Sequence, residues 1–311
     1  MNFQKLDIEF LKTMPLPDWG DDANKGTRGK LLIVGGSQRI AGAAILASRA
    51  ALRTGCGTVR LAAPQSVALQ IGIAVPELMV IPLPETSSGT IARAGLELIA
   101  AQFESCQALV LGPGLDENDE TDALSREIVA QSPLPTLVDA QALTALGKSA
   151  KMNAKMGESP RVLTPHVVEF EALSGQKVVE DERVSTAHDF AEKSGATLVL
   201  KGRETVIASP NQTPVQNEAG SRALGTAGSG DVLAGIIGSL LAQGMGAHQA
   251  AIWGVHFHAL AGEAVAKDGE EDGEEDGVLA RDFIERLPGI QKYLRRLTHA
   301  DKKGGFGLRH S

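Results

Sequence analysis

The chain has 311 residues, and 43% of them are hydrophobic, which is enough for one large buried core. Aromatic residues make up only 4% and glycines number 35, a composition typical of an α/β protein with an aliphatic core. Most of the formal net charge of -8 lies in the acidic repeat at 268–277, and no basic stripe with interleaved aromatics is present, so binding to nucleic acid is excluded.

The N-terminus and the cysteines indicate the compartment. Residues 1–10 mix charges into their apolar residues, so they lack the apolar region of a signal peptide. No uncharged apolar run reaches the roughly 18 residues that a membrane span needs. Cys56 and Cys106 stand in apolar surroundings and predict buried free thiols rather than a disulfide framework. We therefore expect a soluble cytoplasmic protein that contacts no membrane.

Short β-type runs alternate with alanine-rich helical stretches along most of the chain. This alternation predicts an α/β fold with a mostly parallel central sheet flanked by helices. We expect strands at 30–34, 58–62, 108–111, 136–138, 161–163 and 197–200. Apolar periodicity predicts helices, the last two of which should pack side by side, at 42–54, 121–131, 185–193, 232–241 and 247–267.

We expect one catalytic domain, residues 25–297. Residues 1–24 should form an N-terminal extension and residues 298–311 a C-terminal tail. Within the domain, the acidic repeat at 268–277 predicts a solvated loop between two helices. Residues 279–297 have helical spacing on both sides of Pro288-Gly289 and predict a final broken helix.

Glycines and polar residues follow the expected strands where each strand ends. In an open α/β sheet, ligands bind at the carboxyl ends of the strands, so these segments should converge on one crevice. Any one of them could instead be a simple turn signal. The segments are Gly35-Gly36-Ser37, Gly112-Pro113-Gly114, Asp139, Thr164-Pro165-His166 and Lys201-Gly202.

The stretch 224–235 carries the clearest chemical signal. Its glycines, Gly225, Gly228 and Gly230, allow positive φ and close approach to a ligand, and the apolar helix behind them begins with unpartnered N–H groups. Such a helix start binds anions. Asp231 stands where an N-cap would, and a carboxylate there opposes a phosphate unless it takes a proton from an attacking hydroxyl. The alternative is a plain aspartate cap.

Two better-known phosphate motifs do not match this loop. It has no lysine at the helix start, as a P-loop would, and no acidic ribose partner follows at the spacing of a dinucleotide fingerprint. It resembles instead the anion-hole loop of the ribokinase-like fold, in which a glycine-rich turn ends in a catalytic aspartate.

The ordered set of motifs over about residues 25–267 resembles the NAD(P)H-hydrate dehydratases. Each motif alone is weak, but together they match in type, order and approximate spacing. They are Lys25 to Ser37, Gly42-Ala43-Ala44, Leu52 to Gly57, Gly112 to Leu115, Val138-Asp139-Ala140, Leu163 to His166 with Glu169-Phe170, Leu200-Lys201-Gly202 with Thr205-Val206-Ile207, and the Asp231 loop.

The resemblance implies a ribokinase-like three-layer sandwich and a lyase, specifically a hydro-lyase that repairs nicotinamide cofactors. Such enzymes dehydrate NADHX and NADPHX, the hydrated forms of NADH and NADPH, with ADP or ATP as co-substrate. Mg²⁺ is expected with the nucleotide phosphates. The resemblance also implies a homo-oligomer and a functional link to a separate NAD(P)HX epimerase.

Site roles carried over by resemblance fall on matching positions. Asp231 would be the base at the substrate hydroxyl. Ala43, Gly114 and His166 would contact the hydrated dinucleotide, the first two being small because a large substrate presses against backbone there. The anion hole would consist of Ala227, Gly228, Ser229 and Gly230. Gly230 would also contact the nucleotide, and the residues along its adenosine part would be Lys201, Gly202, Arg203, Glu204 and Thr205.

Two of these residues also have a purely structural explanation. Two other positions depart from the family pattern. His166 could simply satisfy a turn after Pro165, and Lys201 could be a surface lysine at a strand end. Gln141 stands where the family usually has a second aspartate, which puts in doubt a role there in metal-water or proton handling. Ala227 replaces a glycine and will restrict the backbone if positive φ is needed.

His256 and His258 lie two residues apart on an expected helix and therefore point to different faces, so a shared metal ion is not expected. Trp253 and Phe257 are more simply core residues. Two competing functions remain open: a ribokinase-like small-molecule kinase that phosphorylates an alcohol, and a nucleotide-binding protein without turnover. The sequence indicates neither the preference for ADP or ATP nor the size of an oligomer.

Overall fold

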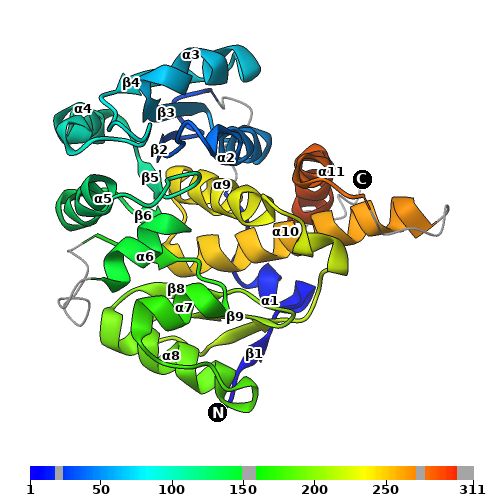
Figure 1. Ribbon diagram of the computed structural model, residues 1–311. Helices are drawn as coiled ribbons and strands as arrows, with labels where there is room; N and C mark the ends of the chain where they lie inside the picture. The colour runs from blue at the N-terminus through cyan, green and yellow to red at the C-terminus, as the bar shows by residue number, and fades with distance from the viewer. Residues whose placement is uncertain (18–23, 149–158, 271–276, 300–311) are drawn as a thin grey trace, which may run out of the picture.

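The computed structural model describes residues 1–17, 24–148, 159–270 and 277–299. Within these ranges, ten strands form one sheet in the order β1-β10-β9-β8-β7-β6-β5-β2-β3-β4 (Figure 1). From β4 to β8 all neighbours are parallel, whereas β9 runs antiparallel to β8 and β10. The strands are β1 (Gln4–Lys5), β2 (Lys30–Val34), β3 (Thr58–Pro64), β4 (Met79–Leu83), β5 (Ala108–Leu111), β6 (Thr136–Val138), β7 (Arg161–Leu163), β8 (Thr197–Leu200), β9 (Thr205–Ala208) and β10 (Val215–Asn217).

Alternate strand residues feed two separate cores, one on each face of the sheet. Leu31 and Ile33 pack into the first core, and Leu32 and Val34, their neighbours on β2, pack into the second. The first core is covered by α1 (Ile8–Lys12), α2 (Ala41–Arg53), α3 (Gln65–Ala74), α9 (Ser229–Ala242), α10 (Ala247–Glu270) and α11 (Ala280–His299).

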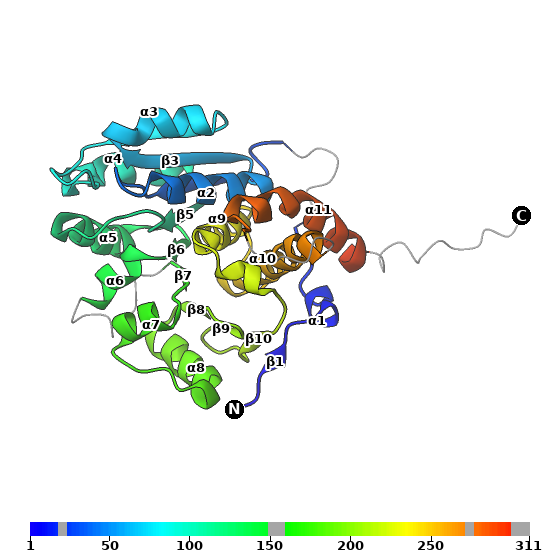
Figure 2. The same cartoon turned by 45° about the vertical axis from the view of Figure 1, so that its right-hand side comes forward.

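The second core is covered by α4 (Leu96–Ala100), α5 (Asp119–Gln131), α6 (Gln141–Gly147), α7 (Val167–Ser174) and α8 (Arg183–Ser194). Figure 2 shows the sheet between these two helical layers. The predicted α/β three-layer architecture with a mostly parallel sheet is confirmed. Short 3-10 turns lie at Arg93–Gly95, Phe103–Ser105, Glu180–Glu182 and Arg222–Gly225.

Helix α9 lies at the centre of the first layer because its glycines allow close packing. A Cβ on Gly235 would lie 2.2 Å from the Ala47 carbonyl oxygen of α2, and one on Gly238 would lie 2.3 Å from Val110 of β5. Gly254 of α10 packs against Ile237, which is another residue of α9. The prediction that these two helices pack side by side is confirmed, and the contacts fix the glycine loop that precedes α9 at the carboxyl edge of the sheet.

The predicted break in the last helix is wrong. Helix α11 runs through Pro288 from Ala280 to His299. A proline removes one main-chain hydrogen bond. Phe283, Leu287 and Leu294 are buried on both sides of it, and their packing holds the helix in one piece. The final residues of the expected tail, 300–311, lie outside the described residues.

The acidic repeat begins inside a helix rather than in a loop. Helix α10 continues past residue 267 to Glu270, so the expectation of a loop from residue 268 is wrong for its first residues. Residues 271–276 of the repeat lie outside the described residues.

The first residues of the chain take part in the body of the molecule. β1 pairs in parallel with β10, and Leu11 and Leu16 are buried in the first core. The indole Nε1 of Trp253 donates a hydrogen bond to the Met14 carbonyl oxygen at 2.8 Å. Trp253 and Phe257 are themselves fully buried, as predicted. Residues 1–17 therefore contribute to the core as well as to the sheet edge.

Both cysteines are buried free thiols, as predicted. Burial raises the pKa of Cys56 to about 11, so its thiol is protonated and unreactive at neutral pH. None of the helices in the described ranges combines the length and the apolar character that crossing a bilayer requires.

Candidate active site

Close backbone packing shapes the carboxyl edge of the sheet at β2, β5 and β6. A Cβ on Gly112, where φ is +130°, would lie 1.9 Å from the Asp139 carbonyl oxygen, and a Cβ on Gly114, where φ is +74°, would lie 2.3 Å from that of Ile40. The same Cβ on Gly114 would lie 3.1 Å from Ala43, so positions 43 and 114 do lie together. The protein's own backbone already requires glycine at 114, which corrects the explanation from substrate contact.

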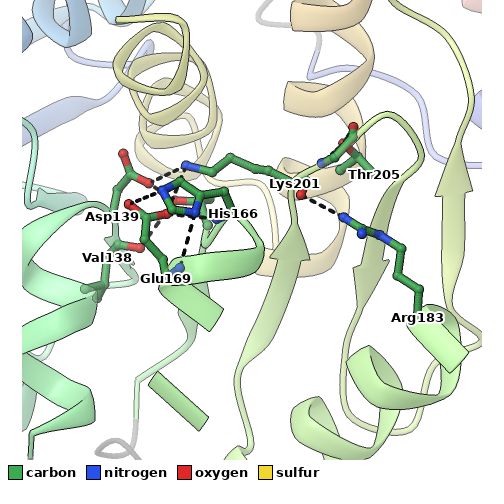
Figure 3. Close-up of polar contacts among 9 residues, drawn as sticks. Val138, Asp139, His166, Glu169, Arg183, Lys201 and Thr205 are labelled. Atoms are coloured by element: carbon green, nitrogen blue, oxygen red, sulfur yellow. Dashed lines mark hydrogen bonds and ion pairs between the residues drawn. The ribbon is translucent and has the colours of Figure 1, made fainter. Parts of the chain in front are cut away.

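A buried charge cluster lies beside these turns. The Lys201 ammonium, at the end of β8, lies 3.1 Å from Asp139 Oδ1 and 3.6 Å from Glu169 Oε2 (Figure 3). Thr164 Oγ1 donates to the same Asp139 oxygen at 2.7 Å. Burial alone would lower the pKa of Lys201, but Asp139 and Glu169 outweigh it and raise that pKa. Lys201 therefore carries a full positive charge, and it is a partly buried site lysine rather than a free surface residue.

The backbone next to Asp139 is strained. Ala140 has φ +51° and ψ -131°, a conformation that residues other than glycine rarely adopt. Such strain costs on the order of 1–3 kcal/mol and persists where the surroundings impose it, often at functional sites. Here it turns the chain from β6 into α6 directly after the carboxylate that pairs with Lys201.

His166 is the N-cap of α7. Its Nδ1 accepts from the Glu169 N–H at 3.2 Å, and Glu169 Oε2 accepts from the His166 N–H at 2.8 Å, which completes a capping box. The turn-satisfying role considered for His166 is therefore real. The imidazole is also half exposed at the crevice, within 3.6 Å of the second Glu169 oxygen, so the cap does not prevent contact with a ligand.

The glycine loop differs from its expected geometry in two respects. Gly228 is the N-cap of α9, with φ +88°, and Asp231 stands in the first turn of the helix, so the prediction that Asp231 occupies the N-cap position is wrong. Among the three loop glycines, Gly225 and Gly230 do not take positive φ. Nor does Ala227, so its replacement of a family glycine costs no backbone strain there.

Gly230 faces the charge cluster. A Cβ at Gly230 would lie 3.4 Å from Lys201 Nζ and 4.0 Å from Asp139 Oδ2. The start of α9 and the Lys201 ammonium therefore border the same space. Both attract anions, the helix through its N–H groups and dipole and the lysine through its charge.

Asp231 borders this space as well, and its environment disfavours its charged form. Burial raises the pKa of Asp231 to about 7, with a further increase from Asp139 and an opposing effect of Lys201. A carboxyl group that titrates near neutral pH is suited to proton transfer.

We expect Gly228→Ala to destabilise the protein by at least about 1 kcal/mol, because alanine disfavours left-handed backbone. Its Cβ would also lie 2.5 Å from Leu46 and 3.2 Å from Ala280. Gly225→Ala is the matched control, because its φ is not positive and no atom lies within 4 Å of the added Cβ. Urea unfolding should separate the two variants; equal stabilities would contradict the strained-cap assignment.

A buried arginine holds the Lys201–Gly202 turn. Arg183 Nη2 donates to the Lys201 carbonyl oxygen at 2.7 Å, and a Cβ on Gly202 would lie 2.2 Å from the same nitrogen. Thr205 Oγ1 donates to the Gly202 carbonyl oxygen at 3.1 Å, and Arg203 and Glu204 are exposed at the tip. Sequence reasoning missed Arg183 and the pairing of Glu169 with Lys201, although Glu169 stands in a quoted motif.

Gln141 points away from the crevice. Its side-chain amide donates to Asp122 Oδ1 of α5 at 3.0 Å, and the other Asp122 oxygen pairs with Lys148 at 2.9 Å. This departure from the family pattern therefore lies outside the charge cluster.

The residues of the site fit a magnesium ion carried by a nucleotide rather than one held in a protein cage. Over the described ranges, no group of three or more His, Cys, Asp or Glu side chains could hold a metal ion. Asp139, the most buried acid of the charge cluster, already pairs with Lys201 and Thr164. Magnesium commonly keeps several waters and binds through phosphate oxygens with one or two carboxylates.

The fold and the arrangement of the site together define an α/β protein of the ribokinase-like class. Solved structures agree. The ADP/ATP-dependent NAD(P)H-hydrate dehydratase from Bacillus subtilis, co-crystallised with ATP/Mg²⁺, matches with a TM-score of 0.78 and 27% identity over 94% of this chain and 99% of that one. A ribokinase-like superfamily protein from Enterococcus faecalis has the same TM-score at 24% identity, over 94% and 96% of the two chains, and shows the shared fold.

The chain belongs to the NAD(P)H-hydrate dehydratase family, whose sequence model matches residues 31–285. It is 40% identical to an ADP-dependent (S)-NAD(P)H-hydrate dehydratase from Xanthomonas campestris, over 92% of this chain and 95% of that protein. A bifunctional NAD(P)H-hydrate repair enzyme from Thermofilum pendens is 38% identical over 94% of this chain, which spans only 55% of that enzyme's length.

Proposed function

We propose that this protein is a nucleotide-dependent dehydratase that converts NADHX and NADPHX back to NADH and NADPH. The observation that carries the proposal is the placement of Asp231, with its pKa raised to about 7, in the first turn of a glycine-capped helix that shares its space with Lys201. The family membership and the relatives named above support the same reaction.

The overall reaction is that of a lyase, but its first step needs the catalytic groups of a kinase. Hydroxide is a poor leaving group and phosphate a good one, so the ring hydroxyl is first phosphorylated. The Asp231 carboxylate takes the hydroxyl proton as the oxygen attacks the terminal phosphorus of the nucleotide and the bond to the rest of the nucleotide breaks. Phosphate then leaves with the C–O bonding electrons, a ring proton is lost, and the double bond returns.

The start of α9 and Lys201 would stabilise the negative charge of the phosphoryl group. The N–H groups of Ala227, Gly228 and Gly230 would surround the transferring phosphoryl group, and the Lys201 charge would offset its negative charge. The Ser229 N–H already donates to the Thr226 carbonyl oxygen at 3.1 Å, so Ser229 would contribute its hydroxyl group. Because its ammonium lies beside Gly230, Lys201 suits the phosphates better than the adenosine. Mg²⁺, when bound with the nucleotide, supplies further charge neutralisation.

Each side of the crevice is assigned to one of the two ligands. We assign Ala43, Gly114 and His166 to the hydrated dinucleotide, and the backbone from Gly202 to Thr205, ordered by Arg183, to the adenosine part of the nucleotide. The glycine turns pack tightly on one side of the crevice, and Arg183 holds the Gly202 turn on the other. Both sides are therefore rigid, as the binding of two large ligands in line requires.

The test is recovery of the near-ultraviolet absorbance of reduced nicotinamide. Purified protein, Mg²⁺ and hydrated cofactor are mixed with ADP in one series and ATP in another, with a no-nucleotide control. Absorbance should return only when a nucleotide is present, and the two rates give the nucleotide preference. No recovery with either nucleotide would remove the proposal.

The family match favours the dehydratase over a small-molecule kinase and over a binding protein without turnover. Several expectations remain proposals: Mg²⁺ as the cation, a homo-oligomer, a cytoplasmic location and cooperation with a separate epimerase. Bifunctional repair enzymes among the relatives support the epimerase link.

The pH dependence of kcat/KM should follow Asp231. Because the base acts only when ionised and its pKa is raised to about 7, the rate should fall as the pH drops below 7 and should level off above it. Initial rates from pH 5 to 9, corrected for acid hydration of the cofactor, measure this limb. A rate that stays flat down to pH 5 would contradict a base with a raised pKa.

A further inference from the structure

A residue on a neighbouring helix also contacts the glycine loop, and the reaction described above assigns it no role. Ser229, the first residue of α9, is buried, and its hydroxyl oxygen lies 2.9 Å from Nε2 of His258 on α10. The two residues are 29 positions apart in the chain, so the contact depends on how α9 and α10 pack. Ser229 is one of the residues assigned to the anion hole.

The ring of His258 is itself fixed from the other side. Phe283 of α11 packs edge-on against it, with ring centroids 6.1 Å apart and an interplanar angle of 79°. The segment that leads into α11 also contacts the loop directly, since Thr226 Oγ1 donates to the Val278 carbonyl oxygen at 3.1 Å. The start of α11 therefore holds both the glycine loop and the histidine.

His258 is neutral at physiological pH. Burial lowers its pKa to about 4; a hydrogen bond with the Ser229 backbone opposes this, and the charge of Lys201 acts in the same direction as burial. A neutral imidazole adds no charge to the phosphate site, so any effect of His258 on the reaction has to come through its hydrogen bond. When its Nε2–H donates to the Ser229 oxygen, the serine proton is left available for a bound anion.

We propose that His258 is a positioning residue of the anion hole, which through its hydrogen bond to Ser229 holds the first residue of α9 with its hydroxyl group facing the transferring phosphoryl group. The inference rests on the proposed function and adds to it a residue on a different helix. It also gives the segment 278–283 a role, because that segment holds the imidazole in place. Preorganised donors stabilise a transition state because they need no reorganisation during the reaction.

Three variants separate positioning from packing. His258→Phe keeps a ring against Phe283 but removes the hydrogen bond, and we expect kcat to fall by about tenfold, less than for a direct oxyanion donor. His258→Gln places an amide nitrogen near the position of Nε2 and should recover most of kcat. His256→Phe is the matched control, because His256 is buried on the same helix against Trp253 and its Nδ1 finds no hydrogen-bond partner in the described part of the chain.

The decisive measurement is a double-mutant cycle with Ser229→Ala. If His258 acts through Ser229, the double variant with His258→Phe should be no slower than Ser229→Ala alone, within about twofold. The KM for hydrated cofactor should stay unchanged while kcat falls. The proposal would be overturned if the two losses of kcat multiplied in the double variant. It would also be overturned if His258→Gln failed to recover kcat, or if a folded His258→Phe variant kept normal kcat.

Failure of the proposed function gives a different result. If wild type and His256→Phe both lack turnover, the dehydratase assignment fails. Calorimetric titration with ATP and Mg²⁺ then tests the His258 contact alone: weaker binding by His258→Phe than by His256→Phe supports it, and equal binding overturns it.

Discussion

Asp231→Asn should lower kcat by at least about 10²-fold, the low end expected for loss of a positioned base. Asparagine has nearly the same shape but cannot accept the hydroxyl proton. Binding of ATP and Mg²⁺ should persist, because the α9 amides and Lys201 are unchanged. Stopped-flow absorbance gives the rate and calorimetry the affinity. A variant with near-normal turnover would show that Asp231 serves only the helix end.

The same substitution should stabilise the folded protein at high pH. A carboxyl group whose pKa is raised by folding destabilises the folded state once it ionises, so the penalty grows from about pH 4 to about pH 7 and stays constant above. We expect Asp231→Asn to melt at least about 2 °C higher than wild type at pH 8 and at nearly the same temperature at pH 4. A lower melting temperature at pH 8 would contradict the burial penalty.

Lys201→Met should reduce both activity and stability. It removes the positive charge beside Gly230 and leaves Asp139 and Glu169 without their ammonium partner. Breaking a buried pair by removing one partner costs on the order of 3 kcal/mol. Loss of one charge at a phosphoryl site typically costs about 10²-fold or more in kcat. Urea unfolding and steady-state kinetics measure the two losses.

A second substitution separates these two effects. Adding Asp139→Asn to Lys201→Met removes the unpaired buried charge, so stability should return in part while activity stays low. Lys5→Met, which breaks an exposed pair with Glu218, is the matched control and should change neither. Full recovery of activity in the double variant would show that Lys201 has only a structural role.

Much of the fold was predictable because buried parallel strands appear in the sequence as continuous apolar runs. The six expected strands are present, five with the expected bounds, and β3 extends to Pro64. The strands β1, β4, β9 and β10 were missed, since they lie at or near the two outer edges of the sheet, away from the continuous parallel centre. Helix α11 was expected to break because the packing that overrides Pro288 comes from distant parts of the chain.

The parts of the site that the sequence could not show depend on contacts between distant residues. Asp139 and Lys201 follow the ends of β6 and β8, and Glu169 lies in the first turn of α7, so only the sheet order brings them together. Gly228, with φ +88°, caps α9 in place of Asp231, and the sequence does not show which of the loop glycines takes positive φ. His258 was considered only as a metal ligand, whereas its partner Ser229 lies on another helix.

The central claim is that Asp231 deprotonates an alcohol which a nucleotide then phosphorylates, and that the phosphate leaves to restore the reduced cofactor. Phosphorus NMR of the reaction, followed together with nicotinamide absorbance, tests it most directly. We predict one inorganic phosphate for each reduced nicotinamide restored, and neither in Asp231→Asn. A stable phosphate ester that accumulates without recovery of absorbance would contradict the account.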